Sequence, residues 1–100
     1  MTIRTISSQR YLDPSIVAAK VASADFEVQV VLVEIAGETY RVIVDGHHSL
    51  AAARNAGVAP EYTPAHPEIQ GEATANPETY LADHQLDSDY YDVETGLDVW

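Results

Sequence analysis

The most regular pattern in the chain is an apolar run between Glu27 and Ala36. In an extended strand it places apolar side chains on both faces, with Val28, Val30 and Leu32 on one face and Val31, Val33 and Ile35 on the other. Burial on both faces is typical of a strand in the middle of a sheet. After a turn at Ala36-Gly37-Glu38, residues 39–45 alternate again, with Tyr40, Val42 and Val44 on one face. The two runs predict a central β-hairpin.

Three segments carry helix signals. Asp13-Pro14 combines an N-cap residue with a proline at the first helical position and predicts a helix over 14–23. Residues 48–56 are rich in alanine and are followed by Gly57, a typical C-terminal cap. Asn76-Pro77-Glu78 repeats the cap-and-proline signal and predicts a helix to about Leu86.

The remaining segments are shorter or irregular. Residues 2–7 predict a short strand, and residues 58–63 predict an edge strand because Pro60 interrupts them. Prolines then punctuate an irregular stretch as far as Pro77. The last fourteen residues are rich in Asp but also in aromatic residues, so we expect them to dock on the domain or on a second copy of it. The prediction is one α+β domain over residues 1–100: a small mixed β-sheet with a central hairpin and two to three flanking helices.

Charge is distributed unevenly. The net charge is −11, all five basic residues precede position 55, and the ten carboxylates from Glu61 to Asp98 are interrupted by no Lys or Arg. This balance disfavours direct DNA binding, which requires basic side chains to neutralise phosphates. The acidic half is expected to be a solvated surface or a face that meets a basic protein partner. The absence of cysteine excludes disulfides and thiol chemistry, and with no apolar leader or membrane-length run we expect a cytoplasmic protein without membrane association.

The candidate chemistry lies at Asp45-Gly46-His47-His48-Ser49, where the second strand of the hairpin leads into the alanine-rich helix. A helix N-terminus presents unpaired backbone N–H groups and the positive end of the helix dipole, which favour an anion. Glycine there allows a ligand to approach the backbone. The corner therefore predicts binding of a phosphate group.

Each side chain of the corner has two interpretations. Asp45 is a general base or a magnesium ligand, or else simply an N-terminal helix cap. His47 and His48 donate hydrogen bonds to phosphate or transfer protons near neutral pH. If the strand continues to His47, that residue shares a face with Asp45 and the two form a candidate metal pair, which still lacks a third ligand. Asp87, Asp89 and Asp92 have the spacing of a calcium loop but lack its Gly and Glu, so we reject an EF-hand.

From about Arg10 to Tyr62, the order of a helix after Asp-Pro, a hairpin, the glycine corner and an alanine-rich helix resembles the ParB/sulfiredoxin-like superfamily. The Asp-Gly-His-His corner is most similar to the free-serine-kinase type of relative. The resemblance implies the ParB/sulfiredoxin-like fold, with an acidic C-terminal extension over 63–100. It also implies ATP or CTP with Mg²⁺ as cofactors, Asp45 and His48 as catalytic residues, Asp45 as the metal ligand, and Gly46, His47, His48 and Ser49 as cofactor-binding residues.

The chain departs from that family in two places. His47 stands where sulfiredoxins have their cysteine, which argues against sulfinic acid reduction. Ser49 stands where the family usually has an arginine, and a serine hydroxyl does not replace a bidentate guanidinium contact with phosphate. Arg54 is a candidate to reach back and supply the missing positive charge but is better explained by a surface ion pair. Arg10 and Arg41 are candidates to line the pocket from neighbouring elements.

Two functions follow from the sequence. The first is a nucleotide- or phosphate-binding domain, with Mg²⁺-dependent phosphoryl transfer or phosphodiester hydrolysis if it is catalytic. The second is a non-catalytic acidic module that binds or inhibits a basic protein partner. A homodimer is compatible with both.

Overall fold

The computed structural model describes residues 3–99 and contains a five-stranded mixed sheet with four helices. In chain order the elements are β1 (Arg4–Ser7), α1 (Pro14–Ser23), β2 (Glu27–Ile35), β3 (Glu38–Asp45), α2 (His47–Ala56), β4 (Glu61–Pro64), α3 (Pro67–Ala75), α4 (Pro77–Asp83) and β5 (Tyr91–Asp92). The strand order is β4-β2-β3-β1-β5. The α+β class is confirmed, and Thr2 of the predicted first strand lies outside the described residues.

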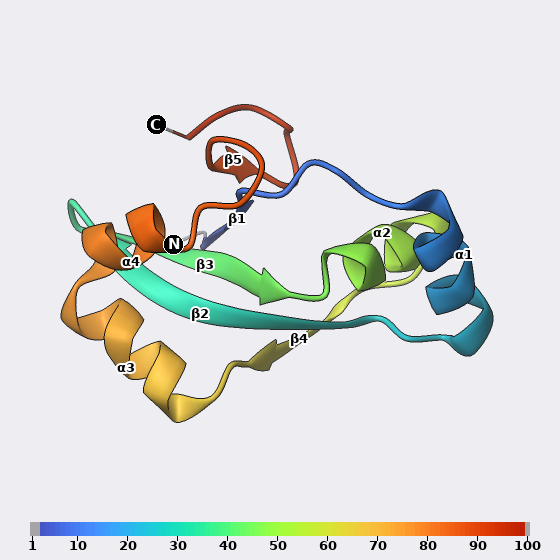
Figure 1. Cartoon of the computed structure of the whole chain (residues 1–100), viewed down its shortest axis with the longest axis horizontal. Coiled ribbons are helices and arrows are strands. Elements are labelled where there is room, and N and C mark those ends of the chain that lie inside the picture. Colours follow the sequence, from blue (N-terminus) through green and yellow to red (C-terminus); the bar gives the residue numbers. More distant parts are fainter. Residues whose placement is uncertain (1–2, 100) are drawn as a thin grey trace.

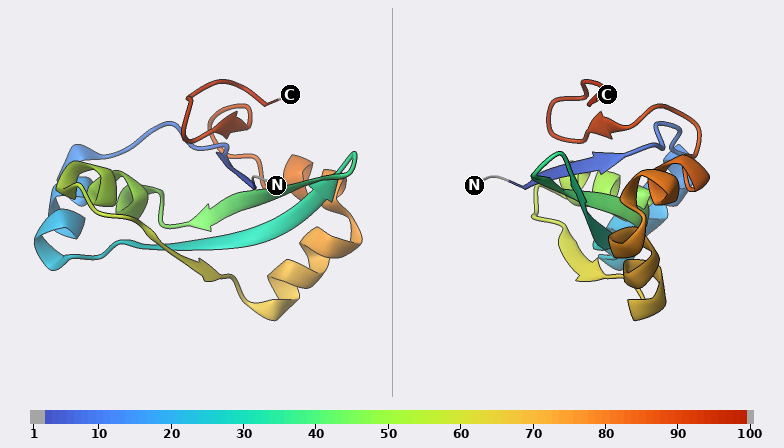
Figure 2. Two further views of the ribbon diagram at one scale, coloured as in Figure 1. Left: turned by 180° about the vertical axis from the view of Figure 1, so that it is seen from behind. Right: turned by 90° about the vertical axis from the view of Figure 1, so that its left-hand side faces the viewer.

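The helices gather at the two ends of the sheet, as Figures 1 and 2 show. α1 packs against α2 at one end, and α3 and α4 lie together at the other. The β2–β3 hairpin runs between the two groups. Its turn places Ala36 and Gly37 at positive φ, which suits the twist of a two-residue hairpin connection.

The core is divided between the two faces of the sheet. The larger cluster joins one face to α3 and α4, and its largest members are Ile6, Val31, Val33, Tyr40, Val42, Tyr80, Leu81 and Tyr90. The smaller cluster joins the other face to α2 and the C-terminal segment through Val28, Val30, Ile43, Leu50 and Val93. The predicted burial of β2 on both faces is therefore confirmed for Val28, Val30, Val31 and Val33.

Leu32 is the exception in β2. Alternation puts it on the face of Val28 and Val30, but its side chain is 45% exposed and is not part of the cluster that those residues form with Leu50 and Val93. Its backbone is beyond the reach of β4, which pairs with β2 only between Glu27 and Val30. The Gln70 side chain of α3 hydrogen-bonds to the Leu32 backbone in place of a neighbouring strand. Its carbonyl oxygen accepts from the Leu32 N–H at 2.8 Å, and its N–H donates to the Leu32 carbonyl at 2.9 Å.

Two helix predictions need correction. Residues 67–75 were expected to be irregular but form α3, which begins at Pro67 after His66 caps it by accepting from the Glu68 N–H at 3.2 Å. The Gln70 contact with β2 stabilises this helix despite its internal Gly71. α4 ends at Asp83 rather than Leu86, and the total of four helices within residues 3–99 exceeds the two to three expected.

The C-terminal segment docks on the domain as predicted. β5 pairs antiparallel with β1, and Val93 is buried in the smaller cluster. The hydroxyl of Tyr90 donates to the Leu81 carbonyl at 2.7 Å, and that of Tyr91 donates to the Gln9 carbonyl at 2.7 Å. Each hydrogen bond joins the C-terminal segment to an earlier part of the chain.

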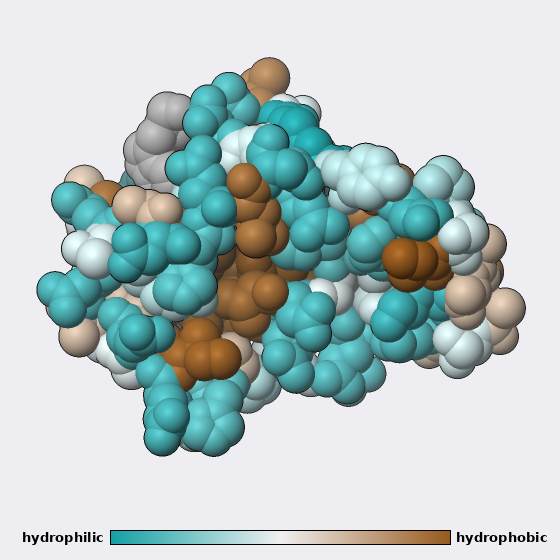
Figure 3. Space-filling view, viewed as in Figure 1, coloured by the Kyte–Doolittle hydropathy of each residue, from teal (hydrophilic) through white to brown (hydrophobic). Residues whose placement is uncertain are grey.

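Most of the surface seen in Figure 3 is polar, with an apolar strip in the middle of the face between the two helical groups. A groove in the larger core's face is lined by Val42, Val44, Leu86 and Tyr90. No helix within residues 3–99 has both the length and the apolar character needed to cross a membrane.

We predict that neighbouring residues of β2 differ sharply in their contribution to stability. Val33→Ala removes a side chain that is 1% exposed and is expected to lower the free energy of unfolding by about 2 kcal/mol. Leu32→Ala is expected to cost less than about 1 kcal/mol, because nearly half of that side chain is already in water. Urea denaturation of both variants measures the difference, and equal losses would contradict this assignment of the faces.

Candidate functional site

Gly46 packs directly against the backbone of β2. Its φ of +94° is in the left-handed region, and a Cβ atom there would lie 2.6 Å from the Glu27 carbonyl oxygen and 2.9 Å from the Val28 Cα. A side chain is excluded by both the conformation and the contact. The requirement for glycine at the corner is thus explained by the packing of α2 on β2.

Asp45 lies at the exposed end of β3. Its Oδ1 accepts from the N–H of the next residue, Gly46, at 2.8 Å and so fixes the backbone at the corner. The side chain of Asp45 does not cap α2. Residues 3–99 contain no group of three His, Cys, Asp or Glu side chains able to hold a metal ion. The Asp45 carboxylate uses one of its oxygens for the backbone, and its role as a magnesium ligand stays a prediction.

His48 connects α2 to the beginning of α1. Its Nε2 accepts from the Asp13 N–H at 3.1 Å, which leaves Nδ1 as the protonated nitrogen of the neutral ring. Asp13 in turn caps α1 as predicted, accepting from the Ser15 N–H at 2.9 Å. The lone pair that a general base would use is therefore occupied by a contact between two helices.

Ser49 faces the protein interior and is 1% exposed. Its hydroxyl donates to Asp25 Oδ1 at 3.4 Å, and Asp25 also pairs with Lys20 at 2.7 Å. The Lys20 hydrogen bond holds the pKa of the Asp25 carboxyl below its usual value. These groups belong to the contact between α1 and α2, and the Ser49 side chain does not face solvent.

His47 is the corner residue with an unsatisfied polar atom. It is 8% exposed, and its Nε2 is buried without a hydrogen-bond partner. Loss of solvation lowers the pKa of the ring, and His48 acts in the same direction, while Asp45 and Asp87 oppose the shift. A buried polar atom without a partner is uncommon and calls for a specific explanation, because it costs free energy.

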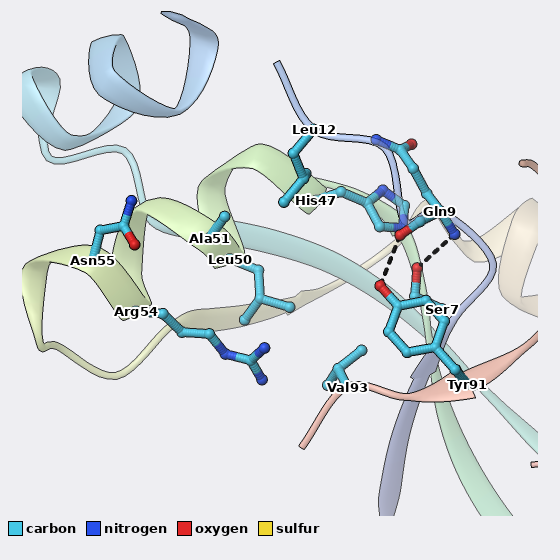
Figure 4. A pocket seen from close by; sticks show the side chains of 10 residues that line it. All are labelled: Ser7, Gln9, Leu12, His47, Leu50, Ala51, Arg54, Asn55, Tyr91 and Val93. Carbon is cyan, nitrogen blue, oxygen red and sulfur yellow. Dashed lines mark hydrogen bonds between the residues drawn. The ribbon is translucent and has the colours of Figure 1, made fainter. Parts of the chain in front are cut away.

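His47 lies at one end of a pocket along α2, which we call the α2 pocket (Figure 4). The cavity has a volume of about 230 Å³ and is lined by Ser7, Gln9, Leu12, His47, Leu50, Ala51, Arg54, Asn55, Tyr91 and Val93. Five of these residues come from α2 at helical spacing, so they share one face of that helix.

The two ends of the α2 pocket differ in character. At the His47 end, the Tyr91 hydroxyl donates to the Gln9 carbonyl and the Gln9 N–H donates to the Ser7 hydroxyl at 3.0 Å (Figure 4). At the other end lie Arg54 and Asn55, with Leu50 and Ala51 between the two ends. The pocket therefore combines an apolar middle with hydrogen-bonding groups at one end and a cation at the other.

Of the three arginines considered for the pocket, Arg54 lines it and Arg10 and Arg41 do not. Arg54 lines the pocket and also pairs with Glu94 at 3.4 Å, so the predicted surface ion pair is present. Arg10 lies over the Tyr91 ring at 4.0 Å and pairs with Asp98 at 3.2 Å. Arg41 stacks on Tyr62 and hydrogen-bonds to Thr5, away from the pocket.

No protein-family model matches the chain, and neither a curated protein nor a solved structure matches it. The resemblance to the ParB/sulfiredoxin-like superfamily therefore rests on the residues of the corner and on the order of the elements around it.

The α2 pocket overlaps only in part with the residues expected at the corner. Of the cofactor-binding residues expected at the corner, His47 lines the α2 pocket, whereas Gly46, His48 and Ser49 do not. Gln9, Tyr91 and Val93 were missed as pocket residues, because they reach α2 only when both ends of the chain pack beside it. The aromatic residues of the C-terminal segment were the available signal, and Tyr91 does lie there; Trp100 is outside the described residues.

We predict that Gly46→Ala lowers the free energy of unfolding by at least about 2 kcal/mol, because the methyl group meets the β2 backbone at a positive φ. The matched control is Gly71→Ala in α3, where a Cβ meets nothing within 4 Å. That change is expected to be neutral or to stabilise by up to about 1 kcal/mol. Thermal or urea unfolding compares them, and a tolerated Gly46→Ala would contradict the close approach.

The buried His47 ring predicts a pH dependence of stability. Because its pKa in the folded chain lies below the ordinary 6.5, the unfolded chain binds more protons as the pH falls through that range. Stability is therefore complete above about pH 7.5 and is lost toward pH 5.5, by at most about 1.4 kcal/mol per pH unit. In His47→Gln, unfolding curves measured across this range should show a flatter profile, and an unchanged slope would contradict the burial.

Proposed function

We propose that this chain is a binding domain for a small phosphate-bearing molecule that occupies the α2 pocket. The observation that carries the proposal is that the α2 pocket is lined both by His47, whose buried Nε2 has no hydrogen-bond partner, and by Arg54, which supplies a guanidinium. A ligand that hydrogen-bonds to His47 removes the cost of that unsatisfied atom. A phosphate group matches the planar set of donors that an arginine provides.

The character of the pocket limits the ligand. Pockets for drug-sized molecules have volumes of roughly 300–1,000 Å³, whereas this one has about 230 Å³. The size favours a monophosphate with a small apolar or aromatic group over a complete nucleoside triphosphate. Leu12, Leu50 and Val93 offer apolar surface for that group, and Asn55 and Gln9 offer amides near the ends.

The proposed phosphate site lies along the side of α2, whereas the sequence predicted it at the N-terminal corner of that helix. His47 keeps a binding role, and Arg54, two helical turns away on the same face, supplies the cation that Ser49 does not. The resemblance of the corner to ParB/sulfiredoxin-like proteins agrees with a phosphate ligand. We assign no catalytic role to Asp45 or His48, since each is engaged in an internal hydrogen bond.

An acidic binding module is the second candidate function. Five acidic side chains are exposed on β4, α3 and α4: Glu61, Glu68, Glu72, Glu78 and Asp83. Within residues 3–99 none of them forms an ion pair, so these three elements carry uncompensated negative charge. A basic protein segment is the partner that such a surface attracts.

Ligand titrations test the first proposal. We expect phenyl phosphate and AMP to shift two-dimensional NMR resonances of α2 and to bind more tightly than ATP or CTP. His47→Phe keeps an aromatic ring but removes the imidazole nitrogens, and Arg54→Gln removes the cation. Arg54→Gln is expected to weaken the binding of both ligands by about tenfold, whereas His47→Phe is expected to weaken only that of AMP, whose base has hydrogen-bonding atoms at the end away from the phosphate. Arg4→Gln, at the exposed start of β1, is the matched control and should bind like the wild type.

The absence of any shift with millimolar phenyl phosphate, AMP, ATP and CTP would overturn the proposal and favour the acidic module. Binding that survives both pocket substitutions would show that the ligand lies elsewhere.

A further inference from the structure

The cation of the α2 pocket already has an acidic neighbour. Arg54 Nη2 lies 3.4 Å from Glu94 Oε1, and the two side chains are 46% and 73% exposed. Glu94 follows Val93, which itself lines the pocket. The internal carboxylate therefore lies beside the place where the anionic group of a ligand would meet Arg54.

Glu94 is positioned by its own turn and not by the arginine. The Asp92 carboxylate accepts from the Glu94 N–H at 2.8 Å, and the Asp92 carbonyl accepts from the Gly96 N–H at 2.7 Å. Arg10 adds a hydrogen bond to the Gly96 carbonyl at 3.0 Å. The turn thus stays in place if Arg54 changes partner.

The contact between the two side chains is easily exchanged. It is long, involves one nitrogen and one oxygen, and is open to water on both sides. Exposed pairs of this kind contribute little to stability. A phosphate group can accept two N–H groups of the same guanidinium in parallel, which is the stronger arrangement.

We infer that Glu94 is an internal competitor for the α2 pocket: its carboxylate holds Arg54 in the ligand-free chain, and a phosphate monoester displaces it. The inference rests on the proposed function and adds regulation of the same site. Glu94 lowers the affinity of the pocket for every anionic ligand, because its carboxylate both occupies the Arg54 guanidinium and repels negative charge. Ligands that contact Arg54 through two oxygens overcome this competition, and those that offer a single oxygen do not.

The test compares Glu94→Gln with Glu61→Gln. Both remove one exposed carboxylate, but Glu61 does not line the pocket and lies on β4, at the opposite edge of the sheet from β5. Phenyl phosphate affinity, measured by calorimetry at low ionic strength, is expected to rise about two- to fivefold in Glu94→Gln and to stay unchanged in Glu61→Gln. In an Arg54→Gln background, removal of Glu94 should give a smaller gain, because only the repulsion remains.

The outcomes separate the two proposals. Equal affinity of the wild type and Glu94→Gln overturns the competition and leaves the phosphate site standing. An equal gain in Glu61→Gln also overturns it, since the effect is then one of net charge. If neither the wild type nor any variant binds phenyl phosphate, the proposed function fails and the inference fails with it.

Discussion

The close approach of Gly46 to the β2 backbone is the constraint on which the rest of the site depends. A Cβ atom at this position would lie within 3 Å of two β2 atoms, so the chain can turn here only with glycine. The turn sets the direction of α2, which buries His47 and Ser49 and places His48 against the start of α1. A glycine that resembles a phosphate-binding element is therefore, in the first place, a packing element.

The corner illustrates how internal hydrogen bonds decide which polar groups remain available. Asp45, His48 and Ser49 each have a partner within the fold, whereas His47 Nε2 has none. The difference lies in what packs beside each side chain: Asp13 and Asp25, which flank α1, are the partners of His48 and Ser49, whereas His47 lines the α2 pocket. The side-chain groups that stay available to a ligand therefore lie along the side of α2 and not at its N-terminus.

The charged side chains divide in a similar way, into those with a partner in the fold and those that face solvent. Three of the basic side chains, Arg10, Lys20 and Arg54, pair with acidic residues of the chain. Two of these pairs attach the C-terminal segment, which forms one wall of the α2 pocket. The acidic C-terminal half thus has two roles, because its last residues complete a pocket while α3 and α4 present negative charge to solvent.

Most of the local elements could be predicted from the sequence alone. Alternation predicted the hairpin, Asp13-Pro14 and Gly57 predicted the ends of helices, and the aromatic residues near the C-terminus predicted docking. Such signals are local, since they depend on neighbours within one or two turns. The sequence missed α3, which is stabilised by the Gln70 contact with β2, and it overestimated the burial of Leu32. Which corner residue lines the α2 pocket depends on the tertiary structure, because the partners of His48 and Ser49, Asp13 and Asp25, come from distant parts of the chain.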